Sequence, residues 1–82
     1  MSMPEMPKWY SDDGSIVSCT EKIKVMTENM SELFELAQDA FEDGLLLEVS
    51  EVQMRETLHQ LINQLVNPYL KPKAALEKSY TN

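Results

Sequence analysis

The sequence predicts an all-α protein, an antiparallel helical hairpin that dimerises into a four-helix bundle. Two segments, 19–43 and 51–67, carry apolar side chains at helical spacing and contain neither glycine nor proline. The linker between them is short, which places the two helices side by side and antiparallel. Their apolar faces are wider than one two-helix contact covers, which favours a second copy of the chain as the covering partner.

Residues 1–17 are expected to form an irregular N-terminal arm. Pro4 and Pro7 remove backbone donors and fix φ, so the start of the arm cannot be helical. Asp13-Gly14 stands between two apolar pairs, which indicates a short β-hairpin because glycine supplies the positive φ of such turns. The arms of this hairpin are too short to be stable alone, so we expect it to fold onto a helix.

The first helix is expected over residues 19–43, within a helical-hairpin domain of residues 18–67. The run Ser18-Cys19-Thr20-Glu21 indicates a capping box with Ser18 as N-cap. Gly44 suits the left-handed position that follows many helix ends. The apolar positions of this helix are spaced alternately by four and three residues and share one face: Cys19, Ile23, Met26, Met30, Leu33, Ala37 and Ala40, widened by Phe34 and Phe41.

The second helix is expected over residues 51–67. Ser50 and Gln53 stand at capping-box positions, and Val49 and Met54 stand at the positions of a hydrophobic staple. Pro68 ends the helix because the residue before a proline is pushed out of helical geometry. The apolar face of this helix consists of Met54, Leu58, Leu61 and Leu65, with Ile62 beside them.

Residues 68–82 form a C-terminal extension in this interpretation. Its run 73–78 is long enough for one or two helical turns but too short to hold a helix unaided. If the chain remains a monomer, aromatic and leucine side chains of the two terminal segments must cover the hairpin instead. The candidates for this alternative are Trp9, Tyr10, Tyr69 and Leu70.

Composition narrows the function classes. The 82 residues make one domain at most, with 14 acidic against 7 basic side chains and a formal net charge of −7. This charge argues against binding to nucleic acid backbones and against docking on anionic membranes. No apolar stretch reaches the roughly 18 residues of a membrane span. The single cysteine, Cys19, cannot form an internal disulfide, which fits a reducing compartment, and we expect a cytoplasmic protein.

The outer face of the first helix is the strongest candidate for a functional surface. Six acidic side chains fall within about 80° of arc opposite the apolar face: Glu21, Glu28, Glu32, Glu35, Asp39 and Glu42. Such a stripe either keeps the protein soluble or binds a partner with a basic surface. Exposed aliphatic side chains at its edge are typical of a protein-binding helix. The candidate partner-binding residues are Glu28, Glu32, Glu35, Asp39, Val25 and Leu36.

Candidate catalytic and metal sites are weak. The chain has no glycine-rich phosphate loop, no metal-spaced Cys/His cluster and no nucleophile spaced with a base, so we expect no enzyme, no cofactor and no metal. Glu56 and His59 match half of a helical di-metal motif, but they point about 165° and 105° away from the predicted core. Cys19 is either a reactive thiol at a helix N-terminus or a small buried hydrophobe.

These observations predict a small acidic protein-interaction or adaptor protein without catalytic activity. Two alternatives from other classes remain open. One is a nucleic-acid-linked regulator whose binding face forms only in the helical-hairpin dimer. The other is a metal or thiol redox protein.

Overall fold

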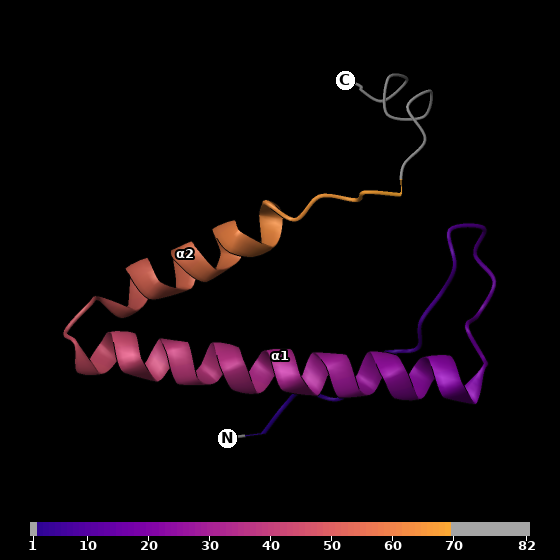
Figure 1. Ribbon diagram of the computed structural model, residues 1–82, viewed down its shortest axis with the longest axis horizontal. Coiled ribbons are helices and arrows are strands. Elements are labelled where there is room, and N and C mark those ends of the chain that lie inside the picture. The colour runs from indigo at the N-terminus through magenta and orange to yellow at the C-terminus, as the bar shows by residue number, and fades with distance from the viewer. Residues whose placement is uncertain (1, 70–82) are drawn as a thin grey trace.

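The computed structural model describes residues 2–69, which form two helices, α1 (Thr20–Leu46) and α2 (Glu51–Asn63), joined by a tight turn (Figure 1). The predicted all-α class and the two-helix arrangement are confirmed. The helices contact each other near the turn and then diverge, so that α2 leaves the long α1 at an angle (Figure 1). The predicted helical turns in the C-terminal extension lie outside the described residues.

A short hairpin precedes α1, as the Asp13-Gly14 turn predicts. Tyr10 and Ile16 form an isolated antiparallel bridge, and the N–H of Val17 donates to the carbonyl of Trp9 at 2.8 Å. Gly14 has a φ of 89°, which supplies the left-handed turn. The hairpin stands at the N-terminal end of α1, while the residues before it run along that helix (Figure 1). Met3, Met6, Trp9 and Val17 are half-buried, so the arm covers part of α1.

The start of α1 differs from the predicted capping box. The N-cap is Cys19 rather than Ser18, and no side chain makes a capping hydrogen bond there. Cys19 has extended geometry, with φ −66° and ψ 118°, and its carbonyl accepts the helical bond from the N–H of Ile23 at 3.0 Å. Ser18 therefore lies one residue too far from the helix to cap it. The predicted start of the helix at residue 19 is wrong by one residue.

The end of α1 corrects the role predicted for Gly44. The helix continues through Gly44 to Leu46, and the left-handed position falls on Glu48, with φ 68°. The N–H of Val49 donates to the carbonyl of Gly44, and that of Glu48 to the carbonyl of Leu45, both at 3.0 Å. These two bonds make a Schellman motif. The predicted end at residue 43 is therefore wrong by three residues, because Gly44 serves packing instead of capping.

The start of α2 is as predicted, but its end is not. Ser50 is the N-cap, and its hydroxyl accepts from the N–H of Gln53 at 3.0 Å. The helix ends at Asn63 instead of at residue 67. The side chain of Asn67 accepts from the N–H of Tyr69 at 2.8 Å, closing a local turn around the proline that competes with helical geometry.

The interior of the described chain is thin. Gly44 is its one fully buried residue. The half-buried apolar side chains of the two helices are Met26, Met30, Phe34, Ala37 and Phe41 of α1, with Met54 and Leu58 of α2. Other members of the predicted apolar faces are exposed, among them Cys19, Ile23, Leu33, Ala40, Leu61, Ile62 and Leu65. A four-helix bundle of two hairpins would cover them.

Candidate protein-interaction surface

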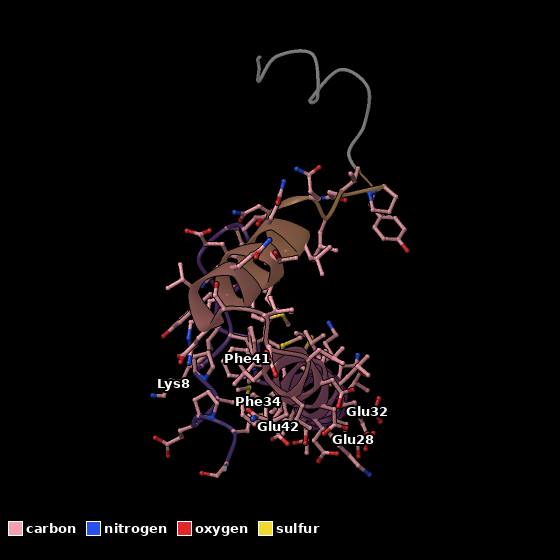
Figure 2. The ribbon with its side chains drawn as sticks, turned by 90° about the vertical axis from the view of Figure 1, so that its left-hand side faces the viewer. Lys8, Glu28, Glu32, Phe34, Phe41 and Glu42 are labelled. Atoms are coloured by element: carbon pink, nitrogen blue, oxygen red, sulfur yellow. The ribbon has the colours of Figure 1, made fainter. Side chains whose placement is uncertain are left out.

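The predicted acidic residues lie on an open face of α1. Glu28, Glu32, Glu35 and Asp39 are all exposed, and we call these four residues the acidic stripe. In Figure 2, Glu28 and Glu32 point away from the side of α1 where Phe34 lies. α1 positions them together because residues three, four and seven apart share a helix face. The helix therefore separates an acidic outer face from a half-buried apolar face.

No side chain of the acidic stripe makes an ion pair within residues 2–69, and Lys24 is the one base on this face of α1. The only ion pair within residues 2–69 joins Arg55 Nε to Glu51 Oε2 of α2 at 2.9 Å. Glu28 with Glu32, and Glu35 with Asp39, are like charges one helical turn apart, and each pair costs about 0.2–0.5 kcal/mol of helix stability. The stripe thus presents a local negative potential that a basic surface would relieve.

Val25 and Leu36 edge the stripe, as predicted from helical phase. Their side chains are 53% and 68% exposed. Both project from α1, so a partner that lies along the acidic stripe would also bury them. Burial of exposed aliphatic surface contributes about 25 cal/mol per Å² to association. The structure thus brings all six predicted partner-binding residues onto one helix and leaves each of them exposed.

An apolar cleft adjoins the N-terminal end of the stripe. It has a volume of about 520 Å³ and lies between the N-terminal hairpin and the first turns of α1. Trp9, Tyr10 and Val17 of the arm face Val25 and Met26 of α1 across it. The sequence predicts that the hairpin folds onto a helix, but it does not reveal that the two leave a hollow between them.

The contact between α1 and α2 includes a cation–π pair. The Arg55 guanidinium carbon lies 4.8 Å from the centroid of the Phe41 ring, while Arg55 also pairs with Glu51. Such contacts contribute about 0.5–1 kcal/mol at exposed sites. Beyond this contact α2 has little cover, and Leu61 and Ile62 are each 60% exposed.

Cys19 is exposed at the N-terminus of α1. The dipoles of the backbone N–H groups of Lys22 and Glu21, in the first turn of α1, favour the thiolate and hold the pKa of the Cys19 thiol below the usual value. Glu56 and His59 are exposed on α2. In residues 2–69 no group of three or more His, Cys, Asp or Glu side chains is placed to hold a metal ion.

Comparison with known proteins adds no relatives: no protein-family model, no curated protein and no solved structure matches this chain. Neither α1 nor α2, the two helices of the described residues, combines the length and the hydrophobicity needed to cross a membrane.

Proposed function

We propose that this chain is a small acidic protein-interaction or adaptor protein without catalytic activity, acting in the cytoplasm through the outer face of α1. The acidic stripe carries this proposal. Four exposed carboxylates that make no ion pair within the described chain are edged by two exposed aliphatic side chains, Val25 and Leu36. Charge complementarity mainly speeds and selects association, whereas aliphatic burial supplies affinity. The partner of this surface is a protein with a basic, partly apolar face.

The proposed form of the protein is a homodimer in which two helical hairpins make a four-helix bundle. Its support is the uncovered apolar surface of α2, where Leu61 is 60% exposed although it lies about 30° from the centre of the apolar face. The two helices meet near their connecting turn and then diverge (Figure 1), so α1 leaves the far part of α2 uncovered. A bundle would bury both apolar faces and leave the acidic stripe outside.

The acidic stripe is tested by charge removal. Glu28, Glu32, Glu35 and Asp39 are replaced together by the corresponding amides, and the variant is compared with the original protein in affinity capture from the native lysate at several salt concentrations. A protein captured through the stripe should bind the original chain less tightly as salt rises and should be lost from the variant. The helix should survive, because the apolar face is untouched, and circular dichroism checks this.

A control variant carries the same charge change elsewhere, at Glu5, Asp12, Glu48 and Glu56, which lie off the stripe. Capture that is lost from the stripe variant and kept by the control supports the stripe as the binding surface. Capture with an unchanged salt dependence by both variants would show that the carboxylates only keep the protein soluble.

The dimer is tested by sedimentation of the intact chain. Leu61 and Val52 have nearly equal exposure, 60% and 66%, but Val52 lies on the opposite side of α2, about 150° from the apolar face. Leu61→Ala should shift the association equilibrium toward the monomer, while Val52→Ala should not. A monomer of 9.4 kDa that persists at high protein concentration would exclude the bundle and favour the capped single hairpin.

A further inference from the structure

An apolar cleft lies between the N-terminal hairpin and α1. Its volume of about 520 Å³ lies within the range of small ligand sites, roughly 300–1,000 Å³. Glu21 and Lys22 stand among its lining residues, but apolar atoms of the arm and of α1 make up most of its surface, so it favours an apolar side chain as occupant. Tyr10 and Val25 are 61% and 53% exposed, which leaves apolar surface in water unless something covers it.

The C-terminal segment of the same chain can reach this cleft. The described chain ends past α2, toward the same end of α1 as the hairpin (Figure 1). Residues 70–82 follow, and 13 residues span up to about 45 Å when extended. This length exceeds that of α1, whose 27 residues rise about 40 Å.

Residues 70–82 carry a net positive charge, whereas the rest of the chain is acidic. The segment holds Lys71, Lys73 and Lys78, three of the seven basic residues of the chain, with a single acid. The preceding 69 residues hold 13 acids against 4 bases, and the acidic stripe has no cation partner among residues 2–69. Leu76 and Tyr80 provide large apolar side chains beside these lysines. A segment with this composition matches an apolar cleft at the end of an acidic helix.

We propose that residues 70–82 dock in the apolar cleft of their own chain, with Leu76 and Tyr80 packed between the N-terminal hairpin and α1. The lysines of the segment then face the acidic stripe. This docking is independent of the proposed partner protein, because it occurs within one chain. Where both hold, the segment competes with the basic partner for the same carboxylates.

Trp9 reports on the cleft directly, because it lines the cleft and is the single tryptophan of the chain. The experiment measures acrylamide quenching of tryptophan emission in the full-length protein and in the full-length double variant Leu76→Ser/Tyr80→Ser. We expect the quenching constant to rise at least twofold in the variant, with emission shifted to the red. A control variant, Leu46→Ser/Leu47→Ser, removes two exposed leucines at the far end of α1 and should leave the quenching unchanged.

The contribution of the three lysines to docking is measured with the full-length variant Lys71→Gln/Lys73→Gln/Lys78→Gln. The acrylamide quenching constant should also rise in this variant. Adding a synthetic peptide of residues 70–82 to the Leu76→Ser/Tyr80→Ser protein should restore the protection of Trp9, whereas the doubly substituted peptide should not. Equal quenching in the original protein and the Leu76→Ser/Tyr80→Ser variant would overturn the proposal. Protection of Trp9 that increases with protein concentration would also overturn it, because the occupant would then be the segment of a second copy.

Discussion

The side chain of Met54 in α2 lies against the backbone of Gly44 in α1, so closely that a Cβ on Gly44 would stand 2.7 Å from Met54 Cε and nearer still to its Sδ. Gly44 is the fully buried residue of the described chain. The absence of a side chain at Gly44 thus lets α2 approach α1 next to the turn. Hydrogen bonds of the turn reinforce this approach, since the Gly44 carbonyl also accepts the N–H of Val49.

The effect of Gly44→Ala on the free energy of unfolding should depend strongly on the side chain at Met54. Inside a helix this substitution normally stabilises by about 1 kcal/mol, because alanine loses less backbone entropy than glycine. Here the new methyl group would displace the Met54 side chain, so the gain should be reduced or reversed. In the Met54→Ala background the full gain should return. Denaturant unfolding of the four proteins gives the coupling energy, expected at about 0.5–3 kcal/mol, and simple additivity would exclude the close contact.

Glu48→Gly should stabilise the protein. Glu48 has a φ of 68°, a left-handed conformation that costs a residue with a Cβ about 1–2 kcal/mol and costs glycine almost nothing. Leu47→Gly is the matched control, because Leu47 has a φ of −85° and gains nothing from glycine. The midpoint temperature of thermal unfolding should therefore rise for Glu48→Gly and fall for Leu47→Gly. A loss of stability at Glu48 would contradict the Schellman geometry.

The two glycines differ in whether their role can be predicted from the neighbouring sequence. Gly14 was predicted in a turn and has the positive φ of one, because its neighbours carry the local signals of a hairpin. Gly44 was predicted as a left-handed cap from its place after an apolar run, but a contact with another helix fixes its role. Local periodicity therefore predicts which residues are helical. It does not predict where helices approach closely, which depends on side chains distant in sequence.

The two serines predicted as helix N-caps should respond differently to alanine. Ser50→Ala removes the hydroxyl that accepts from the N–H of Gln53, which should cost about 1 kcal/mol. Ser18→Ala should have little effect on stability, because α1 begins with Cys19 as its N-cap. Denaturant unfolding monitored by circular dichroism makes the comparison. Equal losses for both variants would restore Ser18 as a capping residue.

Only part of the candidate protein-interaction surface can be predicted from the sequence. The exposure of the acidic stripe follows from helical phase alone, since six acidic side chains opposite an apolar face must point outward. The apolar cleft does not follow from phase. Trp9, Tyr10 and Val17 were predicted to pack on a helix, but the hollow depends on how far the hairpin stands from Val25 and Met26. That separation is set by the path of the arm along α1, for which the sequence carries no periodic signal.

Asp13 should make the hairpin sensitive to acid. The Ser15 hydroxyl and the Ser15 N–H donate to Asp13 Oδ1 at 2.7 and 2.9 Å, and these bonds hold the pKa of the Asp13 carboxyl below its usual 3.8. The stabilising effect is therefore present above the ordinary pKa and is lost as pH falls through the lower, folded value. The hairpin should therefore open below about pH 4, and a change in tryptophan emission should report its opening. Asp13→Asn should remove that part of the pH dependence, and an identical acid response in the variant would assign it to other carboxyls.

Cys19 should react with iodoacetamide at lower pH than an ordinary cysteine. The backbone N–H groups of Lys22 and Glu21, at the positive end of the helix dipole, favour the thiolate and lower the thiol pKa from the model-compound value of 9.0. Because the thiolate is the nucleophile, the alkylation rate should reach half its maximum at a lower pH in the folded protein than in the same chain unfolded in urea. The side chain is exposed, so access should not limit the reaction. Ser18→Ala should leave this profile unchanged, because the donors come from the first turn of α1. Coincident profiles for the folded and unfolded chains would show that those N–H groups do not stabilise the thiolate.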